Sequence, residues 1–280
     1  MEKHIGKEQL MAFAHHLQIE ERAPGTIEKY LRDIRTFVAW LEERQMNKET
    51  VVAWKEHLLT AGYAPQTVNS MLAAVNGLLD YVGRGDQKVK PVKCQRTIFR
   101  AKERELTKVE YLRLLDAARR QGKRRLFLIM ETVCATGIRI SELKYITVQA
   151  AQAGQAVVNC KGKCRVILIP RKLCRQLLKW AKDKKITVGP IFQTSSGKPV
   201  DRSNVWREMK GVCAAAGVDS RKVFPHNLRH LFAVAFYQAE KDIAKLADVL
   251  GHASISTTRI YIMETGAEHE RQLARLGLVV

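Results

Sequence analysis

Apolar residues in the first third of the chain recur every three or four positions, the spacing of one helical face. In residues 26–43, seven apolar positions form one stripe, and Lys29, Arg32 and Arg35 lie on the other face. Similar patterns predict three further helices, over residues 10–17, 47–60 and 64–82. The pattern ends at Gly83 and Gly85, so residues 1–86 are expected to form an all-helical domain.

The periodicity stops in residues 87–106, where seven basic and only two acidic side chains follow one another. We predict that this segment is a linker between two domains. Its charge fits two interpretations: a solvated tether, or a segment that lies along a negatively charged partner. The basic candidates for such a contact are Lys88, Lys90, Lys93 and Arg96.

The second predicted domain, residues 107–280, begins with Thr107 and Glu110 at capping-box spacing. Helical patterns cover residues 107–118, 126–137, 171–183, 202–216, 225–239, 243–250 and 255–264. Two short apolar segments, 155–160 and 165–170, are joined by a tight turn and predict a β-hairpin. The expected fold class is mainly α: a four-helix domain plus a mostly helical domain with a small antiparallel β-sheet.

The charge of the chain is strongly asymmetric. It contains 48 Lys and Arg against 28 Asp and Glu, a net charge of +20. Residues 1–86 have 10 basic and 12 acidic side chains, so the whole excess lies in residues 87–280. A folded domain with such an excess favours a polyanion, because phosphate contacts release condensed counterions. Nucleic acid is the expected partner, and a merely soluble basic protein is the alternative.

The composition also predicts the compartment and the absence of some sites. The six cysteines follow no disulfide-framework spacing and no export signal is recognisable, which favours free thiols in the cytoplasm. No apolar run reaches about 18 residues, so no membrane span is expected. Cys160 and Cys164 have no second Cys or His pair nearby, and no metal site is predicted.

Two motifs of the second domain place cations beside turns. In ATGIRISEL, Arg139 follows a glycine that ends a helix, and Glu142 lies one turn further on, where it can hold the guanidinium. A surface ion pair is the alternative. In the hairpin, Lys161 lies at the turn, with Lys163 and Arg165 beside it. Such a tip can reach into a DNA groove or be simply solvated.

Two further motifs contain histidines. In VFPHNLRHLF, His226 and Arg229 share a face of a helix that begins at Pro225, and His230 is expected to point elsewhere, toward support or packing. In LGHASISTTRIYI, His252 follows a helix end and Tyr261 lies nine residues later. A single tyrosine between two isoleucines is more often a core residue. Together, however, these side chains supply a nucleophile, proton carriers and anion-binding groups for attack on a phosphodiester.

The ordered set TG-x-R-x-SEL, KGK-x-R, PH-x-LRH-x-FA and LGH followed by tyrosine resembles the tyrosine recombinase or phage integrase family, in its Xer-like branch. The resemblance covers nearly the whole chain, since the first four helices resemble the family's SAM-like core-binding domain. It implies a site-specific DNA recombinase that forms a 3′-phosphotyrosyl intermediate without metal, ATP or another cofactor.

The resemblance assigns roles residue by residue. Arg139 and Arg229 bind the scissile phosphate, and Lys161 protonates the leaving 5′-oxygen. His226 assists proton transfer, His252 hydrogen-bonds the phosphate, and Tyr261 is the nucleophile; Glu142 and His230 are supporting residues. This chain departs from the family pattern in the hairpin, where Cys160 replaces a glycine and the turn is shorter. Lys163 therefore stays a second candidate for the catalytic lysine.

The resemblance also implies the partners. We expect the DNA partner to be a double-stranded recombination site. The protein is expected to be a monomer in solution and to form a tetramer on DNA, either of this chain alone or with a paralogue. The C-terminal tail, residues 265–280, is expected to dock on a neighbouring protomer or to fold back on its own domain. Two other functions stay open: a type IB topoisomerase-like enzyme, and a catalytically silent DNA-binding or architectural protein.

Overall fold

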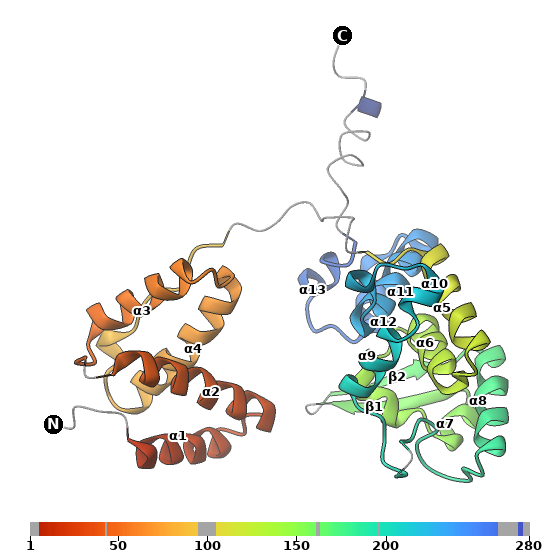
Figure 1. Cartoon of the computed structure of the whole chain (residues 1–280), viewed down its shortest axis with the longest axis horizontal. Coiled ribbons are helices and arrows are strands. Elements are labelled where there is room, and N and C mark those ends of the chain that lie inside the picture. The colour runs from red at the N-terminus through yellow and green to blue at the C-terminus, as the bar shows by residue number, and fades with distance from the viewer. Residues whose placement is uncertain are drawn as a thin grey trace. The chain divides into compact units, whose positions relative to one another are not determined.

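A computed structural model describes residues 6–42, 44–94, 105–160, 163–194, 196–262 and 274–276; the side chains of residues 160 and 163 lie outside this description. The chain divides into two compact units, residues 1–96 and 97–280 (Figure 1). This division falls inside the segment predicted as a linker. Within the described ranges, no helix is both long and apolar enough to cross a membrane.

The first unit contains the four predicted helices around one apolar core. They are α1 (Lys7–Ile19), α2 (Pro24–Leu41), α3 (Lys48–Thr60) and α4 (Pro65–Tyr81). Proline occupies the first turn of α2 and of α4, where no hydrogen bond to its nitrogen is lost. Phe37 and Trp54, both 0% exposed, have their ring centroids 4.9 Å apart in the centre of the core. The predicted helical stripe of residues 26–43 is thus the buried face of α2.

The chain beyond α4 packs on this unit for longer than the linker prediction implied. After a short 3-10 helix, η1 (Gly85–Gln87), Asn76 donates to the Val89 carbonyl at 2.9 Å and accepts from its amide at 3.2 Å. Asn69 bonds the backbone of Val92 in the same way, at 3.0 and 2.7 Å. The two asparagines replace the missing partner of an extended strand. This tethers residues 89–92 to α4, with Lys88, Lys90 and Lys93 exposed.

The second unit combines helices with one hairpin. Its elements are α5 (Lys108–Arg120), α6 (Arg124–Thr136), η3 (Ile140–Tyr145), α7 (Val148–Ala153), β1 (Gln155–Cys160), β2 (Lys163–Leu168), α8 (Arg171–Asp183), α9 (Arg202–Lys210), α10 (Cys213–Ala216), η4 (Ser220–Lys222), α11 (Pro225–Glu240), α12 (Ile243–Leu250) and α13 (Ile255–Arg259). The predicted capping box is present: the Thr107 hydroxyl accepts from the Glu110 amide, and the Glu110 carboxylate accepts from the Thr107 amide. The fold class is therefore confirmed.

The hairpin is antiparallel, with Val157 opposite Val166 and Val158 opposite Arg165. Val158 and Ile167 are buried, whereas Val157 and Val166 are more than half exposed, so one face of the sheet packs on the unit. The second strand begins at Lys163, two residues before the predicted start. Arg165, the predicted first residue of the strand, therefore lies inside its paired part.

Two predicted helices are shorter than their patterns suggested. Residues 202–216 form α9 and α10 separately, because the chain turns at Gly211 and Val212 and α10 then packs against α5. The helix predicted over 255–264 ends at Arg259 within the described residues. The hydrophobic periodicity continued through both ends, but the backbone hydrogen bonds did not.

Candidate active site

Gly137 creates the turn that directs Arg139 toward α11 and α12. It ends α6 with φ +63, in the left-handed region that favours glycine. A Cβ atom at this position would come within 2.5 Å of the Phe232 ring on α11 and 3.0 Å of Leu250 on α12. Close packing of the three helices therefore requires glycine here, and the packing sets the position of the following residues.

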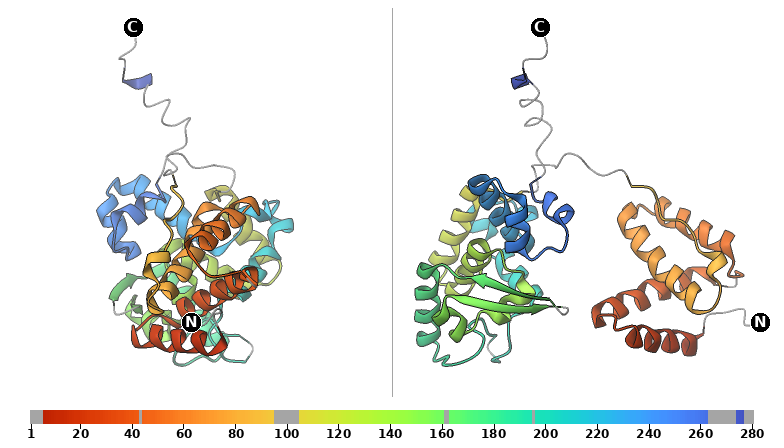
Figure 2. Two further views of the ribbon diagram at one scale, coloured as in Figure 1. Left: turned by 90° about the vertical axis from the view of Figure 1, so that its left-hand side faces the viewer. Right: turned by 180° about the vertical axis from the view of Figure 1, so that it is seen from behind.

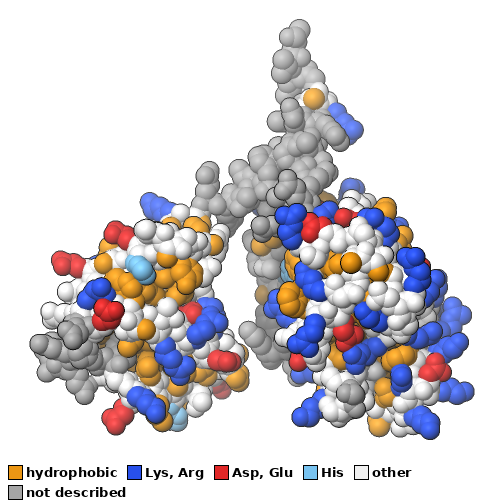
Figure 3. All heavy atoms as spheres, in the orientation of Figure 1, with side chains coloured by type: hydrophobic (Ala, Val, Ile, Leu, Met, Phe, Trp, Pro, Cys, Tyr) orange, Lys and Arg blue, Asp and Glu red, His pale blue; other side chains and the backbone are white. Residues whose placement is uncertain are grey.

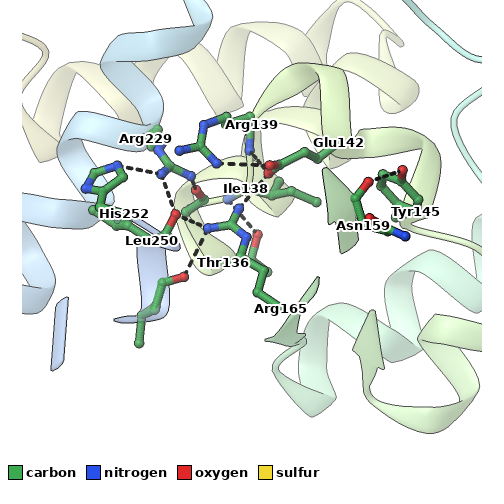
Figure 4. A network of polar contacts seen from close by, with 12 residues as sticks. Thr136, Ile138, Arg139, Glu142, Tyr145, Asn159, Arg165, Arg229, Leu250 and His252 are labelled. Carbon is green, nitrogen blue, oxygen red and sulfur yellow. Dashed lines mark hydrogen bonds and ion pairs between the residues drawn. The ribbon is translucent and has the colours of Figure 1, made fainter. Parts of the chain in front are cut away.

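Glu142 lies almost fully buried, 2% exposed, and binds two arginines (Figure 4). Its carboxylate accepts from the Arg139 guanidinium at 3.0 Å and from the Arg139 amide at 2.9 Å. The second oxygen also accepts from Arg165 at 2.6 Å. Burial alone would raise the pKa of Glu142, but the hydrogen bonds from Arg139 and the charges of Arg165 and Arg139 lower it overall. The ion pair with Arg139 is thus part of a buried network.

Arg165 joins the hairpin to the end of α12. Besides Glu142, its guanidinium donates to the backbone carbonyl of Leu250. Gly251 follows with φ +63, and a Cβ atom there would lie 2.5 Å from Arg165 Cδ. The side chain therefore passes directly over a glycine. Sequence analysis proposed Arg165 as a DNA contact; the structure places it as a bridge between β2, η3 and α12, where its side chain is only 14% exposed.

Arg229 comes from the first turns of α11 and is 3% exposed. Its guanidinium donates to the carbonyl of Gly137, to the carbonyl of Leu250 at 2.8 Å, and to His252 Nε2 at 3.0 Å. Burial, and then the neighbouring charge of Arg139, lower the pKa of Arg229 to about 10, so it stays a cation at neutral pH. Backbone carbonyls hold this cation without neutralising it.

His252 bridges Arg229 and α13. Its Nε2 accepts from Arg229, since a guanidinium has only donors, and its Nδ1 lies 2.9 Å from the Thr258 hydroxyl, which accepts. Burial, followed by the charges of Arg229 and Arg139, lowers the pKa of His252 to about 4. The imidazole is therefore neutral at physiological pH, and Thr258, which is fully buried, orients it.

Tyr261 lies among three histidine rings. Its ring centroid is 5.4 Å from that of His226, 5.6 Å from that of His230 and 5.5 Å from that of His252. Tyr261 is also close enough to Arg229 to raise the pKa of that guanidinium, against the larger effect of burial. It is 7% exposed and packs with Leu246 and Leu250, so it is both a core residue and a neighbour of the cationic network. The two interpretations of this tyrosine are compatible.

The remaining predicted residues either have side chains outside the description or belong to the first unit. Lys161 and Arg96 lie outside the described residues, as does the side chain of Lys163. Lys29 and Arg32 of α2 share the buried carboxylate of Asp33, at 2.7 and 2.9 Å. These two line a hollow of about 440 Å³ together with Ser70 of α4, whereas Arg35 lies beside a different hollow next to α1. The three basic residues of α2 therefore border two different hollows.

No group of three or more potential metal-ligating side chains occurs in the part of the chain that the structure describes. The five cysteines described there, Cys94, Cys134, Cys164, Cys174 and Cys213, are free thiols. Sequence analysis did not predict the part played by Thr258, by the carbonyl of Leu250 or by the bridging contacts of Arg165. The glycine directly before His252, Gly251, was the sequence feature that could have indicated the close approach of a side chain to the backbone here.

Comparisons with known proteins extend over both units. Residues 104–268 match the phage integrase family, and residues 10–84 match the N-terminal SAM-like domain of phage integrases. Among curated relatives, the tyrosine recombinase XerA of Thermococcus kodakarensis is 27% identical over 269 residues, which cover 93% of this chain and 92% of the relative. The tyrosine recombinase XerD of Vibrio cholerae is 26% identical, with 85% of each chain covered.

Among solved structures, a crystal structure of lambda integrase residues 75–356, a dimer bound to a COC′ core site, matches with a TM-score of 0.73. It is 17% identical, over 92% of this chain and 95% of that one. The crystal structure of XerA recombinase covers 96% of this chain and 97% of its own, with a TM-score of 0.54 and 21% identity. These likenesses support the fold assignment.

Proposed function

Because the chain belongs to the phage integrase family, we propose that it is a tyrosine-type site-specific DNA recombinase, which breaks and rejoins DNA strands. One observation carries the residue assignment. Arg139, Arg229 and the pair His252 and Tyr261 come from three separate segments of the sequence. His252 nevertheless contacts both Arg229 and Tyr261, and Arg139 is close enough for its charge to lower the pKa of Arg229. A phenol beside two guanidiniums and neutral histidine is suited to attack on a phosphodiester.

In the proposed first step, the Tyr261 oxygen attacks the scissile phosphorus. A bond forms between the Tyr261 oxygen and the phosphorus, which stays attached to the 3′-oxygen. The bond from phosphorus to the 5′-oxygen breaks, and the phenol proton passes to a base. His226, whose ring lies next to that of Tyr261, is the assigned base. Lys161, or Lys163, donates a proton to the departing 5′-oxygen. Attack by a free 5′-hydroxyl reverses these steps and joins the strands, so the phosphodiester bond is conserved without ATP.

Arg139 and Arg229 bind the non-bridging oxygens, whose negative charge grows in the transition state. Glu142 orients Arg139 through two hydrogen bonds and is therefore a positioning residue. His252 is the assigned hydrogen-bonding partner of the phosphate, and Thr258 orients its ring. His230 stacks on the Tyr261 ring and supports its position.

The proposed partner is a double-stranded DNA recombination site, which suits the excess positive charge of the second unit. Lys29, Arg32, Arg35, Lys88, Lys90, Lys93, Arg96 and Lys163 are further proposed DNA contacts. The active assembly is a tetramer on DNA, either of this chain alone or with a paralogue, and residues 265–280 couple neighbouring protomers. The free thiols are compatible with action in the reducing cytoplasm.

A covalent trap tests the nucleophile. The full chain is incubated with fragmented genomic DNA, and fragments that stay attached after denaturation are sequenced to find the site. A nicked duplex of that site should then give a protein–DNA adduct with the wild type and none with Tyr261→Phe. Tyr111→Phe, on α5 and packed against the other apolar cluster of the same unit, is the matched control and should form the adduct. An adduct with Tyr261→Phe would refute the assignment, and the absence of any adduct would favour a silent DNA-binding protein.

The same nicked duplex tests the two arginines. Arg139→Ala and Arg229→Ala should each slow adduct formation by about a hundredfold or more, because each removes stabilisation of the transition state. Equilibrium binding of the duplex should weaken much less, since other phosphate contacts persist. Equal losses of cleavage and binding would instead make these arginines ordinary docking groups. Relaxation of a supercoiled plasmid that lacks the site would favour a topoisomerase.

A further inference from the structure

Helix α8 carries a stripe of cations that the proposed catalytic reaction does not use. At 100° per residue, Arg171, Lys172, Arg175, Lys179 and Lys182 fall within an arc of about 100°. All five are exposed, while Leu173, Cys174, Leu177 and Ala181 on the opposite face are buried. We call these five residues the α8 stripe.

Acidic neighbours do not neutralise the α8 stripe. Among the residues that the structure describes, none of its five cations takes part in an ion pair. Asp183 is the one acidic residue of α8, and Glu131 of α6 is near enough to Lys172 to interact through its charge. Lys184 and Lys185 follow immediately after the helix and add to the positive field.

The arrangement is unfavourable for an isolated helix. Arg171, Arg175 and Lys179 follow one another at i, i+4 spacing, where like charges repel. Arg171 and Lys172 also stand at the N-terminal end, where the helix dipole disfavours cations. An ordinary solvated helix face mixes both signs of charge along such rows. The stripe therefore has the character of a surface for an anionic partner.

The α8 stripe lies away from the candidate active site. Within the second unit, α8 packs against α6 and α7, whereas Tyr261 and His252 belong to the part formed by α11, α12 and α13. Figures 1 and 2 place α8 and α13 at opposite sides of this unit. Figure 3 shows lysine and arginine side chains gathered along the side where Figure 1 labels α8.

We propose that the α8 stripe binds the phosphate backbone of a second duplex segment, outside the DNA held at the active site. From Arg171 to Lys182 the stripe is about 16 Å long. A duplex presents one phosphate charge per about 1.7 Å of its axis, so a stripe of this length faces several phosphates at once. The contact is independent of base sequence. It holds non-specific DNA near the protein while the other side of the unit searches for, or occupies, the recombination site.

A lysine footprint tests the proposal directly. The full chain is acetylated with a limiting reagent, alone and with a saturating excess of a 40-base-pair duplex of arbitrary sequence, and each site is quantified by mass spectrometry. Lys172, Lys179 and Lys182 should be protected at least several-fold by the duplex. Lys7 and Lys48, exposed on α1 and α3, are the internal controls and should react equally in both samples. Equal acetylation of the stripe with and without DNA overturns the proposal.

A substitution set gives the second measurement. In the triple variant Arg175→Gln, Lys179→Gln and Lys182→Gln, the slope of log K against log salt for the arbitrary duplex should fall in magnitude by about 2 to 3. A matched triple variant, Lys7→Gln, Lys48→Gln and Lys55→Gln, should keep the wild-type slope. An unchanged slope in the α8 variant overturns the proposal, as does protection of the stripe by polyglutamate but not by DNA.

The two proposals fail separately in these experiments. The α8 variant leaves Tyr261 and its neighbours intact, so it should still form the covalent adduct with a nicked recombination site. Because the substitutions remove repulsion along α8, the melting temperature of the variant should equal or exceed that of the wild type. This measurement excludes misfolding as the cause of weaker DNA binding. If the wild type forms no adduct while the footprint is present, only the recombinase assignment fails.

Discussion

Replacing Glu142 with glutamine tests whether one buried carboxylate organises the arginines of the site. Glutamine keeps the size of the side chain and one acceptor oxygen, but removes the negative charge between Arg139 and Arg165. The Arg165 side chain is 14% exposed, so loss of the negative charge leaves a largely buried cation with only neutral acceptors. Removing one member of a buried pair costs about 3–5 kcal/mol. The Arg139 side chain is 41% exposed, and solvent limits its share to below about 1 kcal/mol.

Because glutamine retains a hydrogen bond, we expect the loss of unfolding free energy to lie near the lower end of this 3–5 kcal/mol range, at about 3 kcal/mol. For a unit of this size, about 1 kcal/mol shifts the melting temperature by about 2–4 °C. Glu142→Gln should therefore melt about 6–12 °C below the wild type at pH 7. Calorimetry of the full chain measures this shift in the transition of the second unit. Asp116→Asn, which breaks an exposed pair with Arg120 on the same unit, is the control and should shift by about 2 °C or less.

The pH dependence makes the test sharper. The pKa of Glu142 is lowered in the folded protein, so its stabilisation is fully present above the unfolded value of about 4.3. It is lost as the pH falls through the folded pKa. The difference in unfolding free energy between wild type and Glu142→Gln should thus be constant from pH 8 to 5 and should shrink below about pH 4. A difference that persists unchanged at pH 3.5, or a shift at pH 7 no larger than that of Asp116→Asn, would refute the reasoning.

Two further predictions concern the end of α12. Gly251→Ala should destabilise the second unit by about 1–3 kcal/mol in chemical denaturation and should slow adduct formation. The reason is that a residue with a Cβ atom is strained at φ +63 and that this Cβ would displace Arg165. Gly154→Ala is the control: at φ +71 with open space around it, it shows the effect of the backbone strain alone. For His252, whose pKa of about 4 lies below its unfolded value, folding favours the neutral ring, so the wild type should lose stability relative to His252→Gln as the pH falls from 6.5 toward 4. Parallel pH profiles of the two proteins would contradict this protonation state.

Most of the helices could be predicted from the sequence, because their evidence is local. The stripe in residues 26–43 is the buried face of α2, and the Thr107 and Glu110 spacing gave the start of α5. The failures are also local in origin. Periodicity continued through Gly211 and past Arg259, where the backbone turns, and hydrophobic spacing does not record where a hydrogen-bond ladder stops.

The site was only partly predictable. The sequence identified Arg139, Arg229, His252 and Tyr261 as chemically matched types, and it paired Arg139 with Glu142 because three residues make one helical turn. It proposed a DNA contact for Arg165, but it did not predict that this side chain bonds Glu142 and the carbonyl of Leu250. These contacts join residues 23 and 85 positions apart, and no local pattern encodes them.

The sequence by itself determined the two helical parts, the excess of positive charge and the kinds of side chain available for phosphoryl transfer, since each depends on spacing and residue type along a short stretch. The tertiary structure alone decided that Tyr261 packs among three histidines beside Arg229, and that backbone carbonyls of Gly137 and Leu250 hold the buried cation. It also decided that the cations of α8 lie away from this cluster. The physical reason is that such contacts form between segments distant in the chain, where close packing and the burial of charge, rather than local propensity, select the neighbours.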